Sequence, residues 1–223
     1  MSTSCRPRHH AVDFGVLARF EGRVATGYVP THTRPPNRGE AIGQSGVTVG
    51  MGVDLGCRQE DDLLRLGLDP SLLVKLRPYL GKRRQAAQRA LAACPLRLTG
   101  DEVLALDAAV ASEIIGRLAA RYDAALTCVP CARRFHELPW QAQTVLASLA
   151  WQYGENLPRA TPRFWALATR QDWRAVIAEL ECFGDAYAPR RRQEAKLLRE
   201  MLAAPSEDRP GFDQSDPEPG AHS

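Results

Sequence analysis

Residues 45–56 read SGVTVGMGVDLG, and the rest of the chain is organised around this segment. Its valines and its threonine favour a β-strand over residues 47–53, while its glycines indicate turns or a close approach between backbones. A second stretch, VATGYVP at residues 24–30, favours another short strand. Two strands alone are only marginally stable in water. The sequence therefore predicts a small sheet that packs against helices.

Helical patterns lie on both sides of this sheet. Asp13 is placed to cap a first helix that ends near Glu21. Residues 31–44, between the two strands, are rich in Pro, Gly, Arg and Asn and are predicted to form a loop. Beyond residue 59, apolar side chains recur at three- and four-residue steps, as in helices with one buried face. The predicted helices cover residues 61–68, 71–80, 82–94, 103–122, 138–153, 173–183 and 191–202.

These elements predict an α+β fold that is mostly α-helical. A small N-terminal β-lobe, residues 22–57, would face a larger helical lobe, residues 58–203, across a cleft where a ligand could bind. Residues 1–12 are polar and are expected to be a flexible N-terminus. Residues 204–223 hold few large apolar side chains and are expected to be a disordered tail.

The composition excludes several classes of protein. Hydrophobic residues make up 44% and charged residues 25% of the 223 positions, which is ordinary for a soluble globular protein. A net charge of +3 gives no case for a nucleic-acid binder, and no apolar run approaches the ~20 residues of a membrane span. Residues 1–13 lack the apolar segment of a signal peptide. Two arginine clusters are expected to be solvated surface or to favour an anionic polymer: Arg133-Arg134 and Arg190-Arg191-Arg192.

Six cysteines raise the question of metal binding. Cys128 and Cys131 form a single CxxC motif, which lacks the second ligand pair of a zinc site and the βαβ setting of a redox motif. We therefore expect free thiols, or a disulfide that forms after export, and neither a metal nor a cofactor.

Glu21 and Asp54 suggest a chemistry. The two carboxylates flank the first strand and the loop, and Thr48 lies six positions before Asp54. Two carboxylates suit glycoside hydrolysis, in which one acid protonates the leaving oxygen and the other acts on a water or on the sugar. The pattern alone is weak, because the chain holds 26 acidic residues. On the pattern alone, the ordinary interpretation of Glu21 is a surface helix carboxylate, and that of Asp54 is a turn residue before Gly56.

The same motifs resemble a known family. Phe20-Glu21-Gly22, the segment 27–30 (GYVP) and residues 45–56 look like the pesticin-like muramidase family, bacterial toxin domains related to tailed-phage lysozymes. Residues 147–154, ASLAWQYG, resemble a helix of that family, although Gln152 stands where Asn is usual. The resemblance covers about residues 13–203. The loop at 31–44 is longer than expected for the family.

This resemblance implies a phage-lysozyme-like fold and a catalytic domain over residues 13–203. It implies an enzyme that hydrolyses the β-1,4 bond between N-acetylmuramic acid and N-acetylglucosamine in peptidoglycan, with inversion. Glu21 would be the general acid, Asp54 would activate or position the attacking water, and Thr48 would help to hold that water. The expected substrate-binding residues are Tyr28, Ser45 and Gln152.

The resemblance also bears on partners and location. It implies a monomeric antibacterial effector, toxin or endolysin that binds peptidoglycan glycan strands. We expect it to be made in the cytoplasm and to act in the periplasm or cell wall of a target after delivery or lysis. An immunity protein or a secretion-system delivery component would be its protein partners. Three alternatives stay open: a lytic transglycosylase, an inactive peptidoglycan-binding module, and a helical interaction protein that binds no sugar.

Other side chains have two interpretations each. Trp151, Trp165 and Trp173 could stack on sugars, but tryptophans on helices usually belong to the core. Arg191 could pair with a core acid such as Glu194 or reach the carboxylates of peptide stems, although a surface ion pair is the ordinary expectation.

Overall fold

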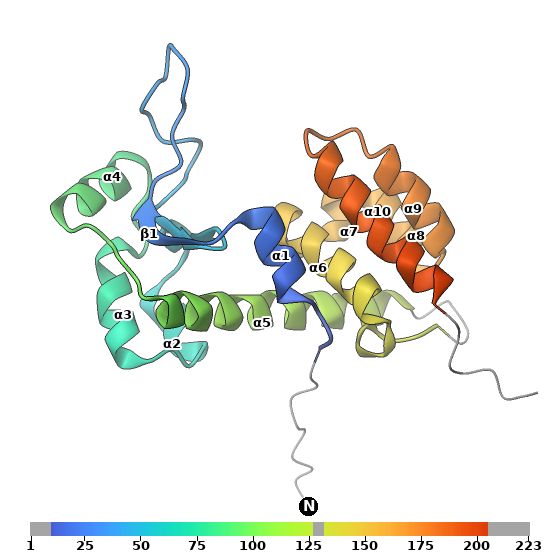
Figure 1. Ribbon diagram of the computed structural model, residues 1–223. Helices are drawn as coiled ribbons and strands as arrows, with labels where there is room; N and C mark the ends of the chain where they lie inside the picture. The colour runs from blue at the N-terminus through green and yellow to red at the C-terminus, as the bar shows by residue number, and fades with distance from the viewer. Residues whose placement is uncertain (1–9, 127–131, 205–223) are drawn as a thin grey trace, which may run out of the picture.

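The computed structural model describes residues 10–126 and 132–204. Most of the predicted flexible N-terminus and disordered tail lies outside these residues, as do Cys5 and the CxxC motif. The chain folds into a small lobe and a larger helical lobe (Figure 1). The elements follow in this order: α1 (Phe14–Glu21), β1 (Val24–Tyr28), β2 (Thr48–Gly50), β3 (Val53–Asp54), η1 (Leu55–Cys57), α2 (Glu60–Arg65), α3 (Pro70–Leu76), η2 (Arg77–Tyr79), α4 (Arg84–Ala93), α5 (Gly100–Ala125), η4 (Phe135–Glu137), α6 (Trp140–Tyr153), α7 (Leu157–Ala160), α8 (Pro162–Thr169), α9 (Trp173–Glu181) and α10 (Ala188–Ala203).

The predicted mostly helical α+β architecture is confirmed, but the sheet has three strands where the sequence predicted two. The strand order is β1-β2-β3, and both pairs are antiparallel. The predicted strand over residues 47–53 is broken by a turn at Met51 and Gly52. Gly50 and Gly52 have φ angles of 66° and 88°, a backbone conformation that residues other than glycine rarely adopt. These two glycines let the chain reverse, so one expected strand becomes a hairpin.

Helices α5 and α6 hold the hairpin turn from two sides. The Met51 N–H donates to Asp107 Oδ1 at 2.9 Å, and Trp151 Nε1 donates to the Met51 carbonyl, also at 2.9 Å. Arg23 Nε donates to the other oxygen of Asp107 at 3.0 Å. Burial raises the pKa of Asp107, and its bonds to Met51 and Arg23 only partly offset this effect. The turn is therefore fixed by contacts with distant helices as well as by its glycines.

The Gly50→Ala variant should lose about 2–4 kcal/mol of unfolding free energy. Alanine disfavours the left-handed backbone, and its Cβ would lie 2.2 Å from Asp107 Oδ1. Gly52→Ala is the matched control, because it has the same backbone problem but no atom within 4 Å of its Cβ, and it should lose about 1–2 kcal/mol. Urea unfolding of both variants measures the difference. Equal losses would mean that the contact with Asp107 does not constrain the turn.

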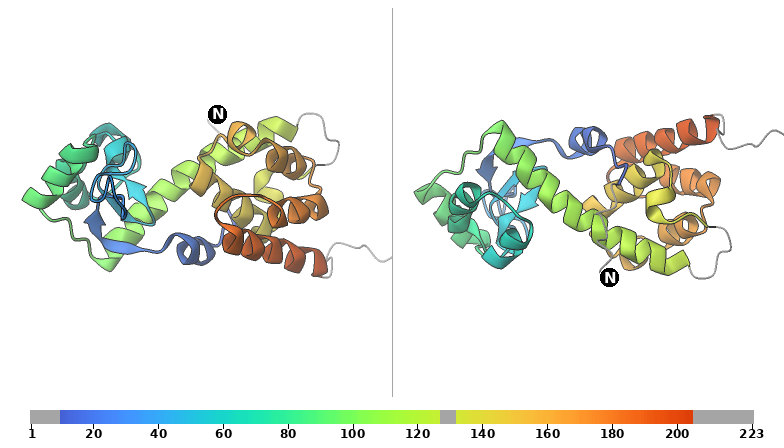
Figure 2. Two further views of the ribbon diagram at one scale, coloured as in Figure 1. Left: turned by 90° about the horizontal axis from the view of Figure 1, so that it is seen from above. Right: turned by 90° about the horizontal axis from the view of Figure 1, so that it is seen from below.

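Two hydrophobic cores define the lobes. One core joins α1 to the helices from the second half of α5 onward, and the other joins the sheet to α2, α3, α4 and the first half of α5. Residues 58–93 therefore pack against the sheet in the small lobe, whereas the sequence predicted that they lie in the helical lobe. The reason is that their apolar faces bury against the valines of β2 and β3. Helix α5 runs through both lobes (Figure 2).

Local sequence signals explain where the helices begin. The Asp13 carboxylate accepts hydrogen bonds from the N–H groups of Gly15 and Val16, as predicted, and α1 ends at Glu21. Thr99 and Glu102 form a capping box at the start of α5. None of the helices in residues 10–126 and 132–204 is both long enough and apolar enough to cross a membrane.

Candidate active site

Glu21 is the last residue of α1 and lies against α10. Its Oε1 is 2.6 Å from Nη1 of Arg190, and the two side chains are 21% and 10% exposed. Within the described ranges, no hydrogen bond or ion pair is made by Glu21 Oε2. One oxygen of this carboxylate is thus anchored by Arg190, and the other makes no such contact.

Arg190 is itself held in place by contacts with Ser148, Glu194 and Phe20. Its Nη2 donates to the carbonyl and the hydroxyl of Ser148, both at 2.9 Å, and its Nε lies 3.2 Å from Glu194 Oε1. The guanidinium also lies over the Phe20 ring, 5.0 Å from the centroid. Residues of α1, α6 and α10 therefore set where the Glu21 carboxylate sits.

Arg191 points into the core rather than into solvent. Its side chain is 1% exposed, and its Nε lies 3.0 Å from Asp185 Oδ2. Its other two nitrogens bind Glu194 Oε2 and Gln152 Oε1. The expectation of solvated arginines at 190–192 is therefore wrong for the first two, because buried acceptors on α6 and α10 surround them. A surface ion pair for Arg191 is likewise ruled out.

Glu194 links the two arginines. It is fully buried, and its Oε1 accepts a 2.5 Å hydrogen bond from the Ser148 hydroxyl. Burial raises the pKa of Glu194, while Arg191, Ser148 and Arg190 act in the opposite direction. A buried charge needs such partners, because an unpaired one costs several kcal/mol.

Thr48 and Asp54 meet on the sheet. They are directly opposite each other in the β2–β3 pairing, so their side chains leave the same face. Thr48 is buried, and its hydroxyl donates to the Gly46 carbonyl over a long 3.5 Å. In the described parts of the chain, no hydrogen bond or ion pair joins either residue to Glu21.

Backbone groups orient the Asp54 carboxylate. Oδ1 accepts from the N–H groups of Gly56 at 2.8 Å and of Gly46 at 3.1 Å. Oδ2 has only weaker contacts, 3.2 Å from the Gly46 nitrogen and 3.8 Å from the Cys57 sulfur. A Cβ at Gly46 would lie 2.5 Å from Asp54 Oδ1, so only glycine allows this close approach.

The three expected substrate-binding residues lie in different settings. Tyr28 is 41% exposed and is opposite Thr48 in the β1–β2 pairing. The Ser45 carbonyl accepts from the Arg84 N–H at 2.8 Å, which ties this residue to the start of α4. Among the described residues, no hydrogen bond joins Gln152 to Thr48 or Asp54. Its Oε1 is taken by Arg191, and its Nε2 is buried without a hydrogen-bond partner there.

The tryptophans and cysteines take up other roles. Trp165 is buried, and Trp151 and Trp173 pack against the core, as expected for tryptophans on helices. Cys57, Cys94 and Cys182 are free and exposed. Within residues 10–126 and 132–204, no group of three or more His, Cys, Asp or Glu side chains is placed to hold a metal ion.

Sequence reasoning missed Arg190 and Ser148 as parts of this site. The four-residue step from Arg190 to Glu194 on one helix face was a signal for their ion pair. No local signal indicated that Arg190 would pair with Glu21, because the two residues are 169 positions apart.

A family model described as "Pesticin: Bacterial toxin homologue of phage lysozyme, C-term" matches residues 11–174. The matched range includes Glu21, Thr48 and Asp54 but ends before α10, which carries Arg190 and Glu194. A search of curated proteins found no match to the chain.

Proposed function

Because this chain belongs to the pesticin family of bacterial toxins homologous to phage lysozyme, we propose that it is a muramidase that cleaves peptidoglycan. Its substrate would be the β-1,4 bond between N-acetylmuramic acid and N-acetylglucosamine. Antibacterial action in the cell wall of a target, as a toxin, effector or endolysin, is part of the same proposal.

One observation carries the proposal, namely the Glu21 carboxylate with one anchored oxygen. Arg190 holds Oε1, whereas Oε2 has no partner among the described residues. A general acid must present one oxygen, with its proton, to the leaving glycosidic oxygen while its orientation stays fixed. The Glu21 side chain has such a free oxygen and a fixed orientation.

Asp54 and Thr48 supply the second half of the reaction. The stronger backbone bonds to Asp54 fall on Oδ1, so Oδ2 is the oxygen that would accept a proton from water. Thr48, directly across from it, would hold that water with its hydroxyl. Attack from the face opposite to Glu21 inverts the anomeric carbon. Inverting enzymes need carboxyl groups roughly 6.5–9.5 Å apart to make room for the water.

The experiment that tests this function is a digest of purified peptidoglycan by the wild-type chain. Released fragments are reduced with borohydride and identified by mass spectrometry. Reducible N-acetylmuramic acid ends are the expected product. Anhydro ends would identify a lytic transglycosylase, and no fragments from a folded protein would favour an inactive peptidoglycan-binding module.

A further inference from the structure

The small lobe carries an uneven distribution of charge. Residues 70–98 contain seven basic side chains and no acidic one, although the whole chain has a net charge of only +3. Lys75 and Arg77 are paired with Glu102 and Glu60. The remaining five make no ion pair with a described residue: Lys82, Arg83, Arg84, Arg89 and Arg97.

The loop at 31–44 is joined to this basic segment. Arg84 Nε donates to the Gly43 carbonyl and Gln88 Nε2 donates to the Gly39 carbonyl, both at 2.8 Å. The loop is also braced internally, since the His32 N–H donates to the Glu40 carbonyl at 2.9 Å. It rises from the sheet as a long projection, and α4 lies near its base (Figure 1).

A cavity of about 380 Å³ lies between the loop and α4. It is lined by Gly39, Glu40, Ala41, Arg84, Gln85 and Gln88. The lining combines one carboxylate, one guanidinium and two primary amides. Neither the Glu40 carboxylate nor the two terminal nitrogens of Arg84 has a partner among the residues that the structure describes. These groups are available to a ligand that carries both charges and amide bonds.

This cavity adjoins the residues that hold Asp54. Arg83, next to Arg84, forms a β-bridge with Gly46, and its Nε donates to the Gly56 carbonyl at 3.0 Å. Gly46 and Gly56 are the residues whose N–H groups bind the Asp54 carboxylate. The cavity is therefore connected to the surroundings of Asp54 through the adjacent residues Arg84 and Arg83.

Resting on the proposed function, we propose that this cavity, formed by the loop at 31–44 and α4, binds the peptide stem of peptidoglycan. The stem is a short peptide on each N-acetylmuramic acid, and it carries free carboxylates, amides and the amine of a diamino acid. Glu40 accepts from the amine, Arg84 binds a carboxylate, and Gln85 and Gln88 bind peptide groups. The loop thereby makes cleavage selective for glycan that bears peptides.

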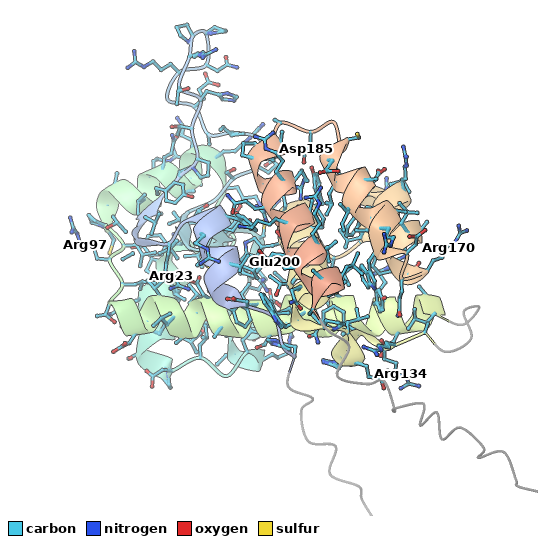
Figure 3. All side chains as sticks on the ribbon, turned by 45° about the vertical axis from the view of Figure 1, so that its right-hand side comes forward. Arg23, Arg97, Arg134, Arg170, Asp185 and Glu200 are labelled. Carbon is cyan, nitrogen blue, oxygen red and sulfur yellow. The ribbon has the colours of Figure 1, made fainter. Side chains whose placement is uncertain are left out.

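Binding by the full chain with Glu21→Gln tests the inference without requiring turnover. Co-sedimentation with sacculi that lack phosphate polymers gives an apparent Kd. A soluble stem tetrapeptide with a diamino acid at its third position is the competitor. The tetrapeptide should displace the Glu21→Gln protein from the sacculi. Adding the substitutions Glu40→Gln and Arg84→Gln to this protein should weaken its binding to sacculi about ten-fold. The tetrapeptide should then no longer compete. The control Arg170→Gln changes an exposed arginine of the helical lobe (Figure 3) and should leave sacculus binding unchanged.

The outcomes separate the inference from the proposed function. Glu40→Gln alone removes no hydrogen bond of the described chain, so it should fold normally and still weaken binding. Displacement by peptide-free glycan or by polyphosphate, but not by the tetrapeptide, would overturn the inference. So would equal binding by the double variant and the Arg170→Gln control. A wild-type chain that releases no fragments would count against the muramidase, while stem-peptide binding would stand.

Discussion

The Glu21→Gln variant is expected to lose glycan cleavage by about 10²- to 10⁴-fold, the range that general acid catalysis contributes. Glutamine has no acidic proton to give to the leaving oxygen. Its amide oxygen can still accept from Arg190 Nη1, so the anchoring contact and the fold should persist. The measurement is the rate of reducing-end release from peptidoglycan, together with the melting temperature.

Two further variants make the result interpretable. Glu155→Gln breaks an ion pair with Arg117 on the partly exposed surface and should leave the rate unchanged. Asp54→Asn should also be severely impaired, because an amide cannot accept the proton of the attacking water. Near wild-type turnover by Glu21→Gln would refute its role as the acid. Full activity of Asp54→Asn would instead favour a lytic transglycosylase, which needs a single acid.

The second large effect concerns the buried arginine. Arg191→Met should lower the unfolding free energy by about 3–5 kcal/mol, the cost of removing one partner from a buried ion pair. Glu194 is fully buried, and Arg191 is one of its two arginine partners. Methionine can pack against the Tyr153 and Phe183 rings, whose centroids lie 5.5 and 4.7 Å from the guanidinium carbon, but it carries no charge. Urea unfolding measures the loss.

A double variant separates charge from packing. The double variant Arg191→Met with Glu194→Leu removes the buried carboxylate together with the arginine that pairs with it. Much of the stability should therefore return. The control is Arg163→Met, which breaks an ion pair with Glu179 from a largely exposed arginine and should cost less than about 1 kcal/mol. If Arg191→Met is no worse than this control, the buried pair does not stabilise the helical lobe. If the double variant is the least stable of all, packing rather than charge decides.

The local features of this protein can be predicted from its amino-acid sequence. Asp13 and the Thr99–Glu102 box mark the starts of α1 and α5, because their side chains bind N–H groups two or three positions away. The end of α1 at Glu21 and the mostly helical α+β class followed from residue spacing. These features depend on neighbours in the chain, and the sequence displays such neighbours directly.

Other features depend on contacts between residues that are far apart in the chain. The turn at Met51 is held by Asp107 and Trp151, which lie 56 and 100 positions away. The anchoring of Glu21 by Arg190 joins the first helix to the last, across 169 positions. An arginine cluster reads the same in a sequence whether it meets water or a buried carboxylate. Which of the two it meets depends on how the helices pack, because the cost of burying a charge is offset only where the fold brings its partners together.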